Sequence, residues 1–106
     1  MTTPLHALIY LDYPEAFERR AALRPAHLAY LAEHAEALKA AGPLLDAQGR
    51  PSGSLLIFET DHPGAIEALA KSDPYVVDKV VETVRVLQWS LAVWALPAAA
   101  VAPAAS

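Results

Sequence analysis

The chain has 106 residues, of which 55% are hydrophobic and 19% charged, with a net charge of −4 and no cysteine. This length suits one compact domain, and the negative charge argues against a protein that binds nucleic-acid phosphates. The absence of cysteine excludes disulfides, a thiol nucleophile and thiolate metal ligands. The N-terminus has no signal-peptide pattern, and no apolar run reaches membrane-spanning length. We therefore expect a cytoplasmic protein that binds neither nucleic acid nor a membrane.

The first half of the chain is predicted to contain one strand and two helices. The strand, Leu5 to Asp12, is largely apolar on both faces, which is typical of a strand covered on both sides. A short helix is expected over 14–20. A long helix is expected from Pro25 to Ala41, because proline suits the first helical position and a following Gly-Pro ends a helix. This places His27 in the first turn, near the positive end of the helix dipole. The expected core stripe is Leu28, Leu31, Ala35 and Leu38.

The second half begins with a predicted hairpin, in which strands 44–47 and 54–60 flank a polar turn. A second helix starts at Pro63, with its inward face expected at Ile66, Leu69 and Ala70. It ends at Asp73, which is a natural N-cap for a short helical piece over 74–79. A long strand follows over 83–96, apolar on both faces and carrying Trp89 and Trp94. We predict a folded domain over 1–97 and a disordered tail, rich in alanine and proline, over 98–106.

The expected order of elements is β-α-β-β-α-β, the ferredoxin-like pattern of the α+β class. Helices cover only one face of such a sheet, yet the first and last strands are apolar on both sides. Two copies packed face to face would cover the second face. We therefore expect a homodimer that forms a dimeric α+β barrel.

Five short motifs lie along the chain: Arg20, Arg24-Pro25-Ala26-His27-Leu28, Ala41-Gly42-Pro43, Gly53-Ser54 and Asp73-Pro74-Tyr75-Val76. In this order and spacing they resemble those of the YciI-like (YCII-related) proteins over residues 5–96. The resemblance implies a ferredoxin-like fold in a dimeric α+β barrel, related to muconolactone isomerase. It also implies an active site built on a His and an Asp, which fall here on His27 and Asp73. Members with an assigned reaction suggest lyase-type chemistry on small cyclic or aromatic compounds, including dehydrochlorination. Where relatives often carry a Lys-Pro-Phe-like run, this chain has Leu87-Gln88-Trp89.

The candidate catalytic pair is His27 and Asp73, which we expect to face one pocket. Imidazole ionises near neutral pH and suits a general acid or base, and a carboxylate partner would orient the ring. The simpler interpretations are a surface histidine in the first helical turn and an ordinary helix cap.

Four further residues are candidates for substrate binding. Arg20 and Arg24 suit an anionic or carbonyl oxygen, whereas Arg19 is interpreted as solvated charge. Ser54 could donate a hydrogen bond, and Tyr75 could form a pocket wall with a polar tip. The simpler interpretations are solvated charge for the arginines, turn chemistry for Ser54 and packing for Tyr75.

Two functional hypotheses follow, and neither requires a metal or a cofactor. His34 lies seven residues after His27, too far for both to ligate one ion without other ligands, and no phosphate-binding loop is present. The first hypothesis is a cofactor-independent lyase or isomerase in which a His-Asp pair transfers a proton on a small cyclic or aromatic-derived compound. The alternative is a dimeric module that binds a small ligand, or a partner domain, without chemistry.

Overall fold

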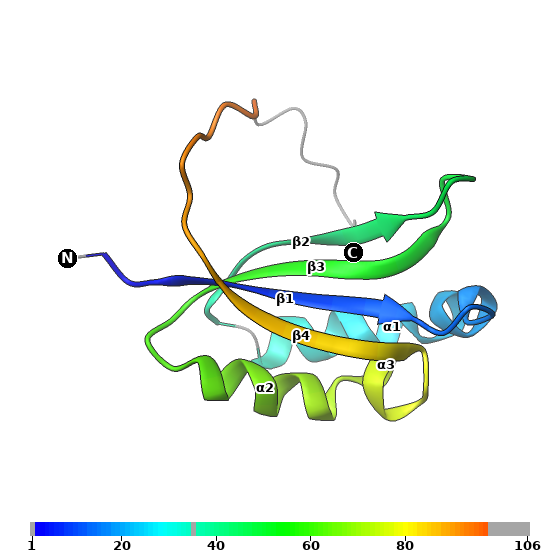
Figure 1. Cartoon of the computed structure of the whole chain (residues 1–106). Helices are drawn as coiled ribbons and strands as arrows, with labels where there is room; N and C mark the ends of the chain where they lie inside the picture. The colour runs from blue at the N-terminus through cyan, green and yellow to red at the C-terminus, as the bar shows by residue number, and fades with distance from the viewer. Residues whose placement is uncertain (1, 35, 98–106) are drawn as a thin grey trace.

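The computed structural model describes residues 2–34 and 36–97, and its helices lie on one face of a four-stranded antiparallel sheet (Figure 1). The strands lie in the order β2-β3-β1-β4. This is the ferredoxin-like arrangement, so the predicted α+β class and element order are confirmed. The elements are β1 (Leu5–Asp12), α1 (Phe17–His34), β2 (Leu38–Leu45), β3 (Pro51–Glu59), α2 (Pro63–Ser72), α3 (Pro74–Val77) and β4 (Val81–Trp89).

Strand β1 lies in the middle of the sheet and has the bounds predicted from its sequence. Alternation sends His6, Leu8 and Tyr10 toward the helices, and Leu8 and Tyr10 are fully buried there. The register pairs Leu8 with Leu56 and Tyr10 with Ser54 of β3. Because side chains opposite each other in a sheet share a face, Tyr10 and Ser54 meet beneath the helices.

Helix α1 departs most from the sequence prediction. It is a single helix over Phe17–His34, with Pro25 inside it rather than at its start. The missing N–H of Pro25 would have bonded to the carbonyl of Ala21, and both residues lie on the exposed side of the helix, where water can satisfy that carbonyl. His27 therefore lies in the middle of the helix. Its predicted place in the first turn, near the positive end of the dipole, is wrong.

The end of the predicted long helix is also wrong, because residues Leu38–Leu45 form strand β2. This segment pairs with β3 from Leu38↔Phe58 to Leu45↔Pro51, and that pairing outweighs the helix-forming tendency of its leucine, lysine and alanines. Pro43 is tolerated because β2 is an edge strand. Ala35 of the predicted core stripe lies outside the described residues.

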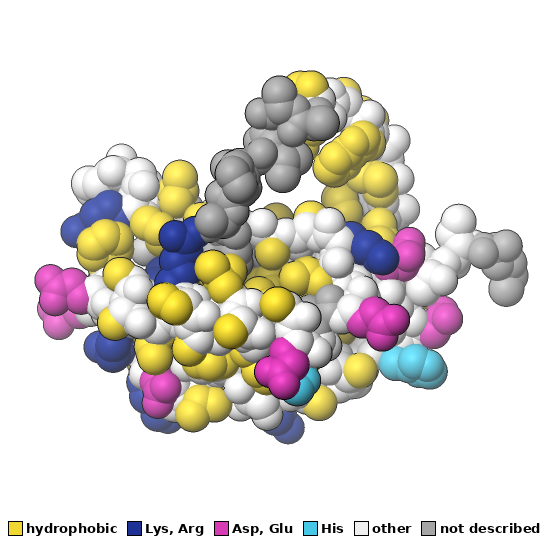
Figure 2. Space-filling view, turned by 180° about the vertical axis from the view of Figure 1, so that it is seen from behind, with side chains coloured by type: hydrophobic (Ala, Val, Ile, Leu, Met, Phe, Trp, Pro, Cys, Tyr) yellow, Lys and Arg dark blue, Asp and Glu magenta, His cyan; other side chains and the backbone are white. Residues whose placement is uncertain are grey.

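Helix α2 begins at Pro63 as predicted, with Ile66 and Ala70 buried and Leu69 packed against the core. Strand β4, by contrast, ends at Trp89 instead of continuing to Leu96, because its neighbour β1 begins at the paired residue Leu5. Residues 90–97 project from the sheet, and Figure 2 shows that hydrophobic side chains gather on this segment. Its exposed hydrophobic residues are Leu91, Val93, Trp94 and Leu96.

The sheet face opposite the helices carries a row of hydrophobic side chains from three strands. No helix of the described residues covers this face (Figure 1). No helix in the described ranges is long and apolar enough to cross a membrane. The predicted tail over 98–106 lies outside the described residues, and the domain boundary at 97 stays a prediction. The exposed hydrophobic residues of this face are Leu11, Leu55, Leu87 and Trp89, each 38–46% accessible. Arg85, which is also exposed and pairs with Ile9, lies among them.

Candidate active site

A cluster of buried polar side chains lies between α1 and the sheet, where the chain enters α3. Asp73 stands at its centre and is fully buried. Its position follows from the sequence Ser72-Asp73-Pro74, because α2 ends there and proline starts α3. The Asp73 side chain accepts a hydrogen bond from the backbone N–H of Tyr75 at 2.9 Å, so the predicted N-cap is present.

The same carboxylate pairs with His27 and Tyr10. The Nδ1 atom of His27 lies 2.9 and 3.0 Å from the two oxygens of Asp73, and the Tyr10 hydroxyl donates to Oδ2 at 2.9 Å. Burial, together with the Asp73 charge, raises the pKa of Tyr10, so its phenol remains a donor. An ionised carboxylate only accepts hydrogen bonds, so the network assigns the Nδ1 proton to His27. Asp73 thereby fixes the tautomer and orientation of the imidazole.

Tyr75 covers the other side of this histidine. The two rings stack with centroids 3.9 Å apart and planes inclined by 14°, and the Arg20 guanidinium lies 4.4 Å from the Tyr75 ring centroid. Tyr75 is fully buried, yet its hydroxyl has no hydrogen-bond partner among the described residues. Burial raises the pKa of Tyr75, with a partial offset from the nearby charges of Arg20 and Arg24, so this hydroxyl is a neutral donor.

Arg20 is held by partners on two strands. Its Nε and Nη2 atoms donate to the Asp12 carboxylate at 2.6 and 3.0 Å, and Nη2 also donates to the Ser54 hydroxyl at 2.9 Å. A Cβ atom at Gly53 would collide with the backbone oxygen of Tyr10, so only glycine allows β3 to approach β1 this closely. The Gly53-Ser54 motif therefore places the serine under Arg20.

A cavity of about 280 Å³ adjoins this cluster. Arg24 stands exposed beside it and has no ion pair among the described residues, whereas Arg20 is neutralised by Asp12. His27 follows Arg24 by one helical turn on the same side of α1, but it is fully buried and is not among the lining residues. The lining residues are Phe17, Arg20, Ala21, Arg24, Pro43, Pro51 and Tyr75.

All six predicted site residues lie in this region, in two groups. His27, Asp73 and Ser54 are buried in the polar cluster, and Arg20, Arg24 and Tyr75 line the cavity. The surface-histidine interpretation of His27 is wrong, since the ring is fully buried. Tyr10 and Asp12 were not among the predicted site residues, although both lie on the face of β1 that the helices cover. The sequence feature that could have indicated them is a tyrosine and an aspartate two residues apart, and so on one face, in an otherwise apolar strand.

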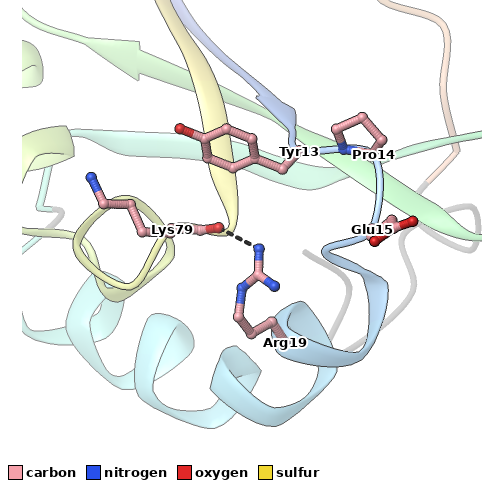
Figure 3. A pocket seen from close by; sticks show the side chains of 5 residues that line it. All are labelled: Tyr13, Pro14, Glu15, Arg19 and Lys79. Carbon is pink, nitrogen blue, oxygen red and sulfur yellow. Dashed lines mark hydrogen bonds between the residues drawn. The ribbon is translucent and has the colours of Figure 1, made fainter.

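A second hollow, of about 600 Å³, lies at the start of α1 (Figure 3). Arg19 reaches across it and donates to the backbone oxygen of Lys79 at 2.7 Å. The hollow contains none of the candidate residues and no buried polar cluster, so we do not regard it as the candidate site. Within the described ranges, no group of three or more His, Asp or Glu residues is placed to hold a metal ion.

A family model described as the YCII-related domain matches residues 5–90. The chain belongs to the YCII-related family. The resemblance found in the sequence motifs is thus confirmed, and the buried His-Asp contact lies within the matched region. No curated protein matches this YCII-related chain in sequence.

Solved structures extend the comparison. The chain is similar to TftG, the 5-chloro-2-hydroxyhydroquinone dehydrochlorinase of Burkholderia phenoliruptrix AC1100, solved in complex with 2,5-dihydroxybenzoquinone. The two share 25% identity and a TM-score of 0.74, over 81% of this chain and 93% of TftG. A putative antibiotic biosynthesis monooxygenase from Bacteriodes thetaiotaomicron VPI-5482 has 11% identity and a TM-score of 0.55, over 91% and 95%. Rv0793 from Mycobacterium tuberculosis has 13% identity and a TM-score of 0.53, over 89% of this chain and 100% of Rv0793. The last two support the fold alone.

Proposed function

We propose that this protein is a cofactor-independent lyase or isomerase that acts on a small cyclic or aromatic-derived compound. The observation that carries the proposal is the buried His27–Asp73 pair. It lies one helical turn from Arg24, which lines the cavity and has no ion pair among the described residues. The similarity to TftG supports it, because that relative is named as a dehydrochlorinase of a hydroxylated aromatic ring.

The cavity residues receive distinct roles in this proposal. Arg24 binds an anionic or carbonyl oxygen of the substrate, because its charge is not engaged by a described carboxylate. Arg20 lines the cavity with its charge balanced by Asp12, and Ser54 acts through Arg20 by holding its guanidinium in place. Phe17 and Tyr75 supply aromatic walls for a flat ring.

His27 is the proton-transfer group. As a base, it takes a proton from substrate carbon beside a carbonyl group, and the electrons of that C–H bond form a carbon–carbon double bond. In an elimination the leaving group departs with its bonding pair. In an isomerisation the proton returns to a different carbon. Asp73 stabilises the imidazolium that forms in either case, and neither route requires an oxidant or a reductant.

The full burial of His27 adds a requirement to this mechanism. Tyr75 covers the imidazole, so its ring has to shift when substrate enters the cavity. Besides its ring contacts with His27 and Arg20, the Tyr75 side chain belongs to the buried hydrophobic cluster of the domain. This movement therefore disrupts the stack on His27 and part of the core packing.

An activity assay with matched histidine variants tests the proposal. Purified protein is incubated without oxygen with 5-chloro-2-hydroxyhydroquinone, and separately with a set of small lactones. Chloride release and product formation are then followed. We expect conversion by the wild type and a loss of about 100-fold or more in His27→Gln. The control is His34→Gln, the same change at a half-exposed site on the same helix. Equal rates in His27→Gln and the wild type, with both folded, would end the proposal.

The alternative function is a non-catalytic module that binds a small ligand. The specific observation in its favour is the complete burial of His27 behind Tyr75. A compound that raises the melting temperature and is recovered unchanged after long incubation would favour this alternative. Conversion of the same compound would exclude it.

We also propose that the protein works as a homodimer. The exposed hydrophobic side chains on the helix-free face of the sheet motivate this, because a second copy could bury them. Two sheets packed through these faces would form the dimeric α+β barrel expected from the sequence.

A further inference from the structure

We infer that the Tyr75 hydroxyl and the Arg24 guanidinium together form an oxyanion site, so the substrate is a planar ring that carries an ionised hydroxyl group. This inference rests on the proposed function only in taking the 280 Å³ cavity as the substrate site. It adds the chemical class of the substrate.

The Tyr75 hydroxyl is buried, and its proton has no acceptor among the described residues. A buried hydroxyl without a hydrogen bond destabilises a fold, and such groups are rare in native proteins. Tyr75 is fully buried and lines the cavity. Arg20 interacts with its hydroxyl only as a donor, so the hydroxyl proton has no acceptor in the part of the chain that the structure describes. A ligand oxygen in the cavity would supply the missing partner.

Two arginines act on the Tyr75 hydroxyl through their positive charge. Both Arg20 and Arg24 lower the pKa of Tyr75, which places positive charge near its oxygen, and burial outweighs them to keep the phenol neutral. Asp12 neutralises Arg20, so Arg24 leaves a net positive charge beside a neutral donor. A donor and a cation that line one cavity suit an anionic oxygen better than a neutral one.

The shape of the cavity favours a flat ligand. The rest of the cavity is formed by Phe17, Pro43, Pro51 and the ring of Tyr75, which present flat apolar surfaces. A flat ring fills such a space, whereas a flexible chain gains less from it. An aromatic or quinonoid ring with one ionised hydroxyl satisfies the shape, the charge and the unpaired donor together.

Calorimetric titration with two matched quinones tests the inference. The first is 2,5-dihydroxybenzoquinone, whose hydroxyl groups ionise at neutral pH, and the second is its neutral dimethyl ether, 2,5-dimethoxybenzoquinone. We expect the wild type to bind the anion more tightly. Tyr75→Phe removes only the hydroxyl and should weaken anion binding about 10- to 100-fold. Its affinity for the ether should change by less than about twofold.

Two further variants keep the test decisive. Arg24→Met should cause a similar loss for the anion, and because Arg24 is exposed, this variant should fold normally. The controls are Tyr13→Phe and Arg19→Met, which make the same chemical changes in the other hollow and should leave both affinities unchanged.

Three results would overturn the inference. They are no binding of the anion by the wild type, unchanged anion affinity in both Tyr75→Phe and Arg24→Met, or equal losses for anion and ether. Failure of the proposed function looks different. Tight binding of the anion without turnover of any ring compound would leave the oxyanion site intact and remove the proton-transfer role. Turnover that is insensitive to Tyr75→Phe would support the proton-transfer role and remove the oxyanion site.

Discussion

Two tyrosines of the site, Tyr10 and Tyr75, are both fully buried but differ in what their hydroxyl groups contact. The Tyr10 hydroxyl donates to the Asp73 carboxylate at 2.9 Å, whereas that of Tyr75 has no described partner. A hydrogen bond to a charged group contributes more to stability than a neutral one, and an unpaired buried hydroxyl contributes a penalty. The same substitution at the two positions should therefore have opposite effects.

We predict that Tyr10→Phe lowers the free energy of unfolding by about 1.5–3 kcal/mol. Tyr75→Phe should leave it unchanged or raise it by about 1 kcal/mol. Urea unfolding followed by circular dichroism measures both variants under the same conditions. A large loss of stability in Tyr75→Phe would mean that its hydroxyl has a structural partner, against the role proposed for it.

At the same scale, much of the site could be predicted from the sequence. The motifs placed His27 and Asp73 together, and the structure brings them within 3.0 Å. Tyr10 and Asp12 were missed because they lie in β1, a largely apolar strand whose residues read as packing rather than as part of a site. Nor could the sequence indicate that Tyr75 covers His27, since that contact joins α1 to α3, 48 residues later along the chain.

At the scale of elements, helix α1 explains where sequence prediction failed. Its buried residues are Arg20, His27 and Leu31, so two of the three inward positions are polar. Hydrophobic periodicity cannot find a helix whose first half faces the core through an ion pair with Asp12. The proline inside it added a false start signal. Helix α2, whose inward face is apolar, and β1, which is largely apolar on both faces, follow the hydrophobic pattern and were predicted well.

The close contact of β1 and β3 depends on Gly53. We predict that Gly53→Ala destabilises the fold by about 1–3 kcal/mol, because the added Cβ would collide with the Tyr10 backbone oxygen. The control is Gly64→Ala in α2, where a Cβ meets no atom within 4 Å and alanine favours the helix. Thermal unfolding of both variants tests this. Equal stability of Gly53→Ala and the wild type would contradict the packing described.

The β2–β3 turn should be sensitive to acid. Asp46 accepts hydrogen bonds from the backbone N–H groups of Arg50 and Gln48, at 3.0 and 2.9 Å, and these lower its pKa below the usual 3.8. A pKa that is lower in the folded state gives stability above the unfolded value and loses it as pH falls through the folded value. Asp46→Asn should be less stable than the wild type near neutral pH.

The measurement is the melting temperature of both proteins between about pH 6 and pH 3. The wild type should lose more than Asp46→Asn over this range, because the variant has no carboxylate to protonate at the turn. Parallel curves for the two proteins would show that the turn contributes nothing to acid sensitivity.

At the scale of the whole molecule, the proposed homodimer depends on the helix-free face of the sheet. We predict that Leu55→Arg weakens self-association at least about tenfold, because it would bury an unpaired charge between two sheets. Val77→Arg is the control, since Val77 is an equally hydrophobic exposed residue on α3, at the helical side. Sedimentation velocity over a concentration series measures both. A monomeric wild type, or a dimer unaffected by Leu55→Arg, would refute the face-to-face arrangement.

The central claim is that the His27–Asp73 pair moves a proton on a ring bound in the cavity. Its most direct test is the exchange of ring hydrogens of 2,5-dihydroxybenzoquinone with solvent deuterium, followed by proton NMR. We predict that the wild type accelerates this exchange over buffer, and that His27→Gln loses about 100-fold or more of the acceleration while His34→Gln keeps it. If the bound ring exchanges no faster than in buffer, or His27→Gln exchanges it as fast as the wild type, then the pair is a structural contact and the protein a binding module.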